Sequence, residues 1–178
     1  MSMIDVDVQR GAIDGLLIVT VKQVSDARGT VRELFRRSAF DAAGIDIGTL
    51  QQVNLTKTYR GAIRGLHAEQ MNKLLTVAAG RALGAYVDLR DGSPTRGTVV
   101  VLDLEPGVQV FLPSGVANAF QALTDEVEYL YCFDNEWRPG MPGKAVTPLD
   151  PALGIEWQEP FIVSDKDRDA PLLAQVLK

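Results

Sequence analysis

The only histidine of this chain, His67, closes the tetrapeptide Arg64-Gly65-Leu66-His67 and is the first candidate for chemistry near neutral pH. Histidine is the one side chain whose unperturbed pKa, about 6.5, lies close to neutrality, so it is a natural proton carrier. A single imidazole cannot build a metal site that depends on several histidines. Taken alone, His67 is either a general base or a hydrogen-bonded polar residue within a strand or turn.

Three further side chains have the chemistry to work beside a general base. Lys73 precedes an apolar stretch by one residue, so its ammonium lies either near the same pocket or in solvent. Tyr131 lies in an apolar run and is either a proton donor or a core tyrosine. Asp88 and Arg90 share one face of an alternating run, which is either the wall of a cavity or a surface exposed to solvent.

Spacing along the chain does not by itself join these residues. In an ideal strand Arg64 and His67 face opposite sides, because an odd separation changes the face. Both side chains reach one cavity only where the strand bends or carries a bulge. The residues by themselves therefore indicate one general base without fixing its partners.

The elements that must position these residues are short apolar or alternating runs separated by Gly and Pro. They occupy residues 16–21, 74–78, 82–89, 98–102, 108–112 and 127–133. Strands of this length with turn residues between them are typical of an antiparallel sandwich or barrel. Short helices are expected only near residues 39–44 and 171–177. The fold class predicted is all-β, with few and short helices.

Composition limits the classes of function. The 178 residues, 46% hydrophobic and 23% charged, fit one domain spanning residues 1–178, with an irregular C-terminal segment from about 135–178 over the β core. A net charge of −5 without a basic cluster argues against nucleic acid as a partner. Cys132, the single cysteine, has no partner for an internal disulfide and favours the cytoplasm. Neither a signal peptide nor the ~20 apolar residues of a membrane helix is expected.

Several motifs follow one another along almost the whole chain. They are Asp26-Ala27-Arg28-Gly29 with Glu33, Gln52-Val53-Asn54, Arg64-Gly65-Leu66-His67, Val87-Asp88-Leu89-Arg90 with Gly92-Ser93-Pro94-Thr95, Leu149-Asp150-Pro151-Ala152-Leu153-Gly154, and Ser164-Asp165-Lys166-Asp167 with Ala170-Pro171-Leu172. In this order they resemble the dTDP-4-dehydrorhamnose 3,5-epimerase family, the RmlC-like members of the cupin superfamily. The resemblance implies a cupin-type jelly-roll β-sandwich or barrel.

The same resemblance implies the reaction and its residues. The expected activity is an epimerase of a nucleotide-activated, dTDP-linked 4-keto-6-deoxy sugar, which inverts C3, C5 or both through an enolate. His67 would be the base, held and polarised by Asp167. Lys73 would stabilise the enolate oxygen, and Tyr131 would return a proton to the opposite face. No metal or cofactor is implied.

Substrate binding and assembly are also implied by the resemblance. The expected contacts with the nucleotide sugar are Arg28, Glu33, Gln52, Asn54, Arg64, Asp88, Asn118 and Trp137. Members of the family are homodimers that exchange an N-terminal strand, here an arm of about residues 1–25. Arg28 and Glu33 would then serve a neighbouring subunit.

The chain departs from the family pattern around this catalytic set. Asn118 stands where a second histidine is usual, and an asparagine hydrogen-bonds but does not shuttle a proton. If Asp88 partners that histidine in the family, a neutral hydrogen bond replaces the pair here. Ala68 and Val31 replace aromatic residues, Trp137 replaces a tyrosine, and the loop after the motif histidine is shortened. These changes leave open which sugar is bound and which carbon is inverted.

Two other functions fit parts of the pattern. A non-catalytic nucleotide-sugar-binding cupin is compatible with the altered surroundings but leaves the set of His67, Lys73 and Tyr131 without a purpose. A sugar 3,4-ketoisomerase is expected to use a pair of histidines, which this chain lacks. The epimerase is therefore the leading hypothesis.

Overall fold

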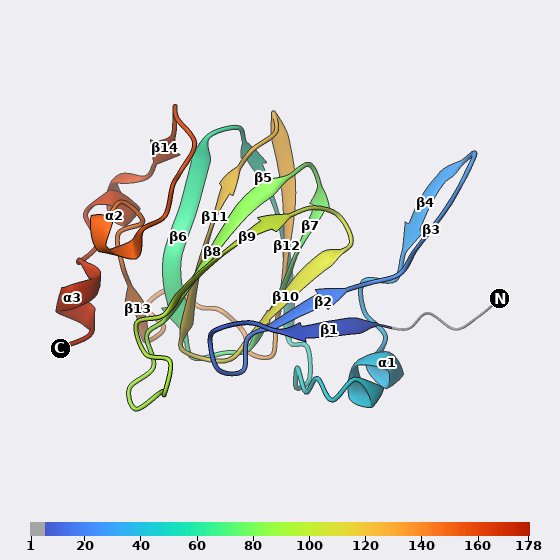
Figure 1. Cartoon of the computed structure of the whole chain (residues 1–178), viewed down its shortest axis with the longest axis horizontal. Coiled ribbons are helices and arrows are strands. Elements are labelled where there is room, and N and C mark those ends of the chain that lie inside the picture. The colour runs from blue at the N-terminus through green and yellow to red at the C-terminus, as the bar shows by residue number, and fades with distance from the viewer. Residues whose placement is uncertain (1–5) are drawn as a thin grey trace.

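The computed structural model describes residues 6–178 and contains two large β-sheets packed face to face (Figure 1). The first sheet has the strand order β1(Asp7–Arg10), β2(Leu17–Thr20), β10(Val108–Leu112), β7(Lys73–Ala79), β12(Glu126–Phe133) and β5(Gln52–Tyr59). The second has the order β13(Gly143–Ala145), β6(Ala62–Glu69), β11(Val116–Ala122), β8(Ala82–Asp88) and β9(Val99–Leu104). Neighbours that are distant in sequence and antiparallel confirm the predicted jelly-roll sandwich.

Helices are few and short, as predicted. They are α1(Arg37–Ala42), the 3₁₀ turn η1(Pro151–Leu153), α2(Asp165–Arg168) and α3(Leu173–Val176). No helix within residues 6–178 is long and apolar enough to cross a membrane. A two-stranded hairpin, β3(Gln23–Asp26) with β4(Gly29–Arg32), projects away from the sandwich (Figure 1). The first five residues of the expected N-terminal arm lie outside the described part of the chain.

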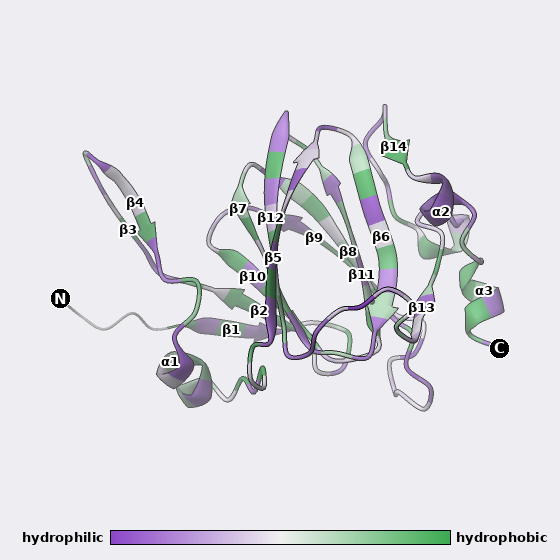
Figure 2. Ribbon diagram, turned by 180° about the vertical axis from the view of Figure 1, so that it is seen from behind, coloured by the Kyte–Doolittle hydropathy of each residue, from purple (hydrophilic) through white to green (hydrophobic). Residues whose placement is uncertain are grey.

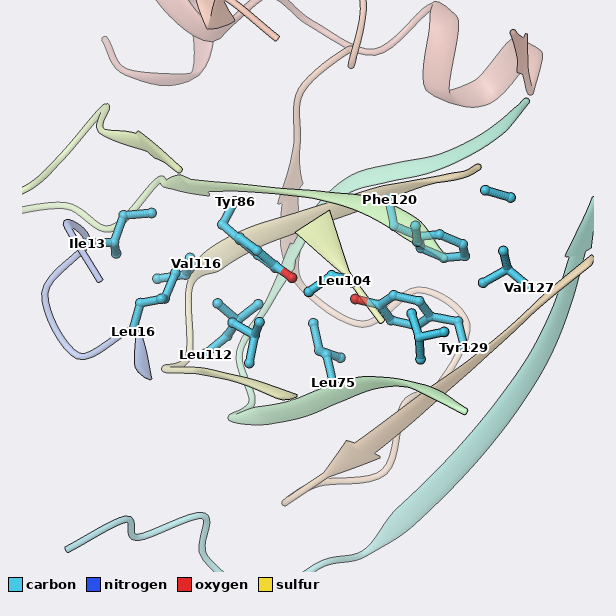
Figure 3. Close-up of a cluster of buried hydrophobic side chains, with 14 residues drawn as sticks. Ile13, Leu16, Leu75, Tyr86, Leu104, Leu112, Val116, Phe120, Val127 and Tyr129 are labelled. Atoms are coloured by element: carbon cyan, nitrogen blue, oxygen red, sulfur yellow. The ribbon is translucent and has the colours of Figure 1, made fainter. Parts of the chain in front are cut away.

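The space between the two sheets is filled by a large apolar cluster. Phe120 of β11 stacks on Tyr129 of β12 with the ring centroids 4.1 Å apart, and both side chains are fully buried. The hydroxyls of Tyr86 and Tyr129 point toward one another within this cluster (Figure 3). Such aromatic pairs contribute about 0.5–1.5 kcal/mol beyond their burial. This core holds β11 and β12 together across the sandwich.

Both sheets are also covered on their outer faces. Residues near α1, among them Phe40 and Ile45, pack on the outside of the first sheet. The C-terminal segment contributes Val146, Leu153 and Leu173 to a cluster on the outside of the second sheet. This double coverage explains why every residue of β11 is buried. The segment 135–178 is more regular than expected, because β13 and β14(Ile162–Val163) extend the second sheet beside β6.

Strand β6 contains one residue more than its partner β11 at the position that matters for the site. His67 pairs with Asn118 and Arg64 with Phe120, so three steps on β6 oppose two on β11. This β-bulge removes the odd-spacing conflict, because it brings Arg64 and His67 to the same side. Elsewhere β6 keeps the alternation of hydrophobic and hydrophilic residues that Figure 2 displays along the strand.

Gly65 makes this bulge possible. Its φ is +117°, and a Cβ built on it would lie 2.4 Å from the Asn118 carbonyl oxygen and 2.7 Å from Ala119. Backbone atoms of a buried strand cannot withdraw as a flexible side chain can. Only glycine therefore allows β6 and β11 to approach at this point.

We expect Gly65→Ala to destabilise the protein by about 3 kcal/mol, because it combines a strained φ with overpacking against β11. Gly92→Ala is the matched control, since Gly92 also has a positive φ, +76°, but its Cβ would meet nothing within 4 Å. The control should lose only about 1 kcal/mol. Urea unfolding of the two variants measures the difference, and equal losses would contradict the role given to the bulge.

Candidate active site

A cavity of about 630 Å³ opens beside β5, β6 and β12, under the C-terminal segment. Six of the residues selected from the sequence line it: Asn54, Arg64, His67, Tyr131, Trp137 and Asp167. They come from three strands, one loop and α2, which the fold brings together from residues 54 to 167. A cavity of this size is typical of sites for small organic ligands.

His67 and Asp167 form a hydrogen-bonded pair at the cavity wall. The imidazole Nε2 lies 2.7 Å from Asp167 Oδ1, and the other carboxylate oxygen accepts the Gly65 N–H at 3.4 Å. Burial by itself would raise the pKa of Asp167, but the hydrogen bonds from His67 and Gly65 outweigh it and keep this pKa below its usual value. The carboxylate therefore stays ionised and fixes the orientation of the ring.

Helix α2 positions Asp167. Ser164 is its N-cap, and the Ser164 Oγ accepts a hydrogen bond from the Asp167 N–H at 3.2 Å. The Asp167 side chain points inward and is only 9% exposed. The serine cap turns the third residue of the helix toward His67.

Tyr131 faces the cavity from β12. Its ring lies 4.9 Å from that of Tyr129 and 5.8 Å from that of Phe133, so the three aromatic residues share one face as the alternation predicts. Burial raises the pKa of the Tyr131 hydroxyl well above its ordinary value. The hydroxyl therefore carries its proton at neutral pH.

Lys73 lies behind this wall. Its side chain is 4% exposed, does not line the cavity, and donates to the His67 carbonyl at 3.3 Å and to Asn118 Oδ1 at 2.7 Å. It also forms an ion pair with Glu69. Burial lowers the pKa of Lys73, and the negative charge of Glu69 opposes this shift. The lysine is thus close to the cavity, as expected, but separated from it by Glu69.

Glu69 was missed by the sequence reasoning. It lines the cavity together with His67 and Tyr131, and its side chain is 18% exposed. The signal that would have found it is the even spacing from His67, because two residues apart on a strand means the same face. An i, i+4 pair of Glu69 and Lys73 across a tight turn was the second signal.

Asp88 does not belong to this site, contrary to expectation. Its side chain is 0% exposed and accepts hydrogen bonds from Arg90 at 2.8 Å and Thr95 at 2.6 Å. The register shows the reason: Asp88 is opposite Val116, whereas Asn118 is opposite Tyr86. Asn118 is therefore out of reach and pairs with Lys73 instead. Asp88 holds the turn after β8.

Four other residues expected to bind substrate do not line the cavity of their own chain: Asn118, which pairs with Lys73, and Gln52, Arg28 and Glu33. Gln52 supports it, because its side chain accepts the Trp137 N–H at 2.8 Å and donates to Asn54 at 3.1 Å. Arg28, at the tip of the β3–β4 hairpin, has a 90% exposed side chain and pairs with the neighbouring Asp26. Glu33, which follows the hairpin, forms an ion pair with Arg36 at 2.6 Å.

No group of three or more His, Cys, Asp or Glu side chains within residues 6–178 is arranged to hold a metal ion. The residues that line the cavity offer one imidazole and two carboxylates, and each carboxylate already has a cationic or ring N–H partner. Acid–base chemistry is what this arrangement supports.

Comparison with known proteins agrees with this geometry. The family model of dTDP-4-dehydrorhamnose 3,5-epimerase matches residues 10–175. The chain belongs to this family. A curated relative, dTDP-4-dehydro-6-deoxyglucose 3-epimerase of Streptomyces bikiniensis, is 38% identical over 84% of this chain and 80% of its own length.

Two solved structures of the family have the same cupin-type jelly roll. A 4-keto-6-deoxy sugar epimerase from the novobiocin gene cluster of Streptomyces spheroides has a TM-score of 0.88 and 31% identity, covering 96% of this chain and 88% of its own. The 3,5-epimerase of Legionella pneumophila, in complex with dTDP-4-keto-L-rhamnose, has a TM-score of 0.87 and 31% identity, covering 97% of both chains. The fold and the family membership inferred from the sequence motifs are thereby confirmed.

We expect Asp88→Asn to destabilise this epimerase-family protein by about 3 kcal/mol near neutral pH, because Arg90 loses its buried partner. Hydrogen bonds from Arg90, Ser93 and Thr95 overcome burial and keep the pKa of Asp88 below its usual value. Its stabilisation is therefore present above the ordinary carboxylate pKa and lost as the pH falls below it.

Urea unfolding of wild type and variant at several pH values measures this loss, which should shrink in acid. Asp103→Asn, at an exposed position on β9, is the control and should change stability by less than about 0.5 kcal/mol. A constant loss from neutral to acid pH would show that Asp88 acts through packing rather than charge.

Proposed function

We propose that this protein epimerises a dTDP-linked 4-keto-6-deoxyhexose at C3, C5 or both. The observation that carries the proposal is the His67–Asp167 pair at 2.7 Å in a cavity that Tyr131 also lines. A base held by a carboxylate and a protonated hydroxyl in one cavity are the two groups that removal and return of a proton require.

The reaction is balanced with these two groups. His67 takes the proton from the carbon next to the 4-keto group, and the electron pair of the C–H bond moves to form the enolate. When the keto group reforms, the pair returns to carbon, which takes a proton from the Tyr131 hydroxyl on the opposite face. The His67 proton and the Tyr131 oxyanion are then reset by exchange with water.

Positive charge near the enolate comes from Arg64, which lines the cavity, and from Lys73, which lies behind the cavity wall. The ammonium of Lys73 lies behind Glu69, and Arg64 lines the cavity with its Nε donating to Thr58 at 3.0 Å. Positive charge beside a developing oxyanion lowers the barrier by a few kcal/mol. Trp137 supplies an exposed aromatic surface, and Asn54 an amide, at the mouth of the cavity.

The choice of substrate is supported by the relatives. The curated relative from Streptomyces bikiniensis is a 3-epimerase of dTDP-4-dehydro-6-deoxyglucose, and the structure from Legionella pneumophila holds dTDP-4-keto-L-rhamnose. Both ligands are dTDP-linked 6-deoxyhexoses with a 4-keto group. Incubation of this protein with dTDP-4-keto-6-deoxyglucose in deuterated water should place deuterium at C3, C5 or both.

We predict that His67→Asn lowers deuterium incorporation by about 10²–10⁴-fold and leaves nucleotide-sugar affinity nearly unchanged. The base acts in the chemical step, whereas affinity comes from groups that contact phosphate and nucleotide base. Mass spectrometry measures the incorporation and calorimetry the binding. Asp167→Asn should show a smaller loss of the same kind, because the ring loses only the group that orients it.

The three candidate activities give different results in this experiment. Deuterium at C3 or C5 supports the epimerase, whereas a carbonyl moved to C3 would indicate a ketoisomerase. Tight binding of the substrate without exchange would indicate a binding protein. If His67→Asn retains most of the wild-type incorporation, the base is another residue and the proposed mechanism is wrong.

We further propose that the protein works as a homodimer in which the β3–β4 hairpin reaches the partner's cavity. Arg28 at its tip is far more exposed than a binding residue needs to be in its own subunit, and the hairpin points away from the sandwich (Figure 1). Strand β5 is a sheet edge with three exposed apolar side chains, Val53, Leu55 and Tyr59. An open apolar edge of this kind favours pairing with a second chain.

Mixed dimers test this arrangement. In a dimer of one His67→Asn and one Arg28→Ala subunit, one of the two cavities has an intact histidine and an intact hairpin from its partner. Co-expression of the two inactive variants should therefore restore about a quarter of wild-type activity, since half of the dimers are mixed. No recovery in dimers verified by tag-based purification would show that Arg28 serves its own subunit.

A further inference from the structure

The ammonium of Lys73 has no donor left for a ligand. It meets three acceptors, the His67 carbonyl, Asn118 Oδ1 and the Glu69 carboxylate, and a lysine has three N–H donors. Its side chain is 4% exposed. Any role of Lys73 at an enolate oxygen therefore depends on how these three acceptors hold it.

Glu69 is the acceptor on the cavity side. The cavity is lined by Glu69 but not by Lys73 or Asn118. The Glu69 carboxylate is also the one charged acceptor among the three, because the other two are a backbone carbonyl and a neutral amide. Of the two side chains that accept from the ammonium, only Glu69 therefore lines the cavity.

We propose that Glu69 is a positioning residue that acts through Lys73, keeping the buried ammonium charged and fixed in place behind the cavity wall. This inference rests on the proposed epimerase function and deepens it. A buried lysine otherwise favours its neutral form, and a neutral amine gives an oxyanion little stabilisation. Burial does lower the pKa of Lys73, and the Glu69 charge is what opposes it.

The surroundings of Lys73 contain few other charges. On β7 Lys73 is opposite Phe133 of β12, and its ammonium meets the His67 carbonyl and Glu69 of β6 and Asn118 of β11. Arg64 and Asp167 complete the titratable or charged groups of the cavity. Asp167 is engaged with His67, so Glu69 is the carboxylate that compensates the Lys73 charge.

The first measurement follows the protonation of the Lys73 side chain and does not depend on enzymatic activity. In full-length protein labelled with lysine at ¹³Cε, the Lys73 signal is assigned through its loss in Lys73→Arg. Its titration midpoint should lie at lower pH in Glu69→Gln than in wild type, because the amide keeps the shape and removes the charge. Glu105→Gln, which removes an exposed carboxylate of the β9–β10 turn, is the control and should leave the midpoint in place.

The second measurement is the pH profile of deuterium incorporation. In Glu69→Gln, kcat should fall by about tenfold between about pH 7 and pH 9, where wild type falls less, while KM changes by less than about twofold. Glu69→Asp keeps the charge and should recover most of the wild-type profile. Adding Glu69→Gln to Lys73→Met should cause no further loss, because Glu69 acts only through the lysine.

Unchanged Lys73 titration in Glu69→Gln would overturn the inference, and so would additive losses in the double variant. If Glu69→Gln fails to fold, Glu69→Asp decides, since a shortened carboxylate should move the Lys73 midpoint in the same direction by a smaller amount. Failure of the epimerase proposal is distinguishable, because wild type then incorporates no deuterium while the lysine titration still responds to Glu69.

Discussion

The extra residue in β6 is the constraint on which the site depends. Because β6 has a β-bulge at Gly65, Arg64 and His67 face one cavity, and the Gly65 N–H points at Asp167. The same strand carries Glu69 two residues after His67, so four chemically important groups lie within six positions of one strand. A regular strand would have turned Arg64 or His67 into the outer cluster that Leu66 and Ala68 occupy.

The C-terminal segment contributes both to the stability of the fold and to the proposed active site. It covers the outer face of the second sheet with Val146, Leu153 and Leu173, and it also delivers Asp167 to His67 across 100 residues of sequence. The strand pairs of β13 and β14 with β6 fix this segment on both sides of the bulge. A carboxylate that orients the base must not move with solvent fluctuations, and a packed segment holds it better than a free loop.

Local pattern was enough to predict much of the fold. Alternation and turn residues predicted four strands close to their observed bounds, at residues 74–78, 82–89, 108–112 and 127–133. The ordered motifs predicted that His67, Asp167 and Tyr131 share one site, and all three line the cavity. What local pattern missed depends on register between distant strands. Alternation left Asp88 either on a cavity wall or on a solvent face, and the resemblance implied a place in the site, but its position opposite Val116 takes it away from Asn118.

This register explains what Asn118 does at the position where the resemblance to the family leads us to expect a second histidine. Asn118 is opposite His67 and points to Lys73, to which it offers a neutral oxygen at 2.7 Å. An amide neither adds nor removes charge with pH, so the lysine is left with one ionic partner, Glu69. With His67 neutral as the general base, the charges in and behind the cavity wall are the carboxylates of Asp167 and Glu69 and the cations of Lys73 and Arg64. Of these two cations only Arg64 lines the cavity, so its guanidinium is the one placed to face an oxyanion that develops during the reaction.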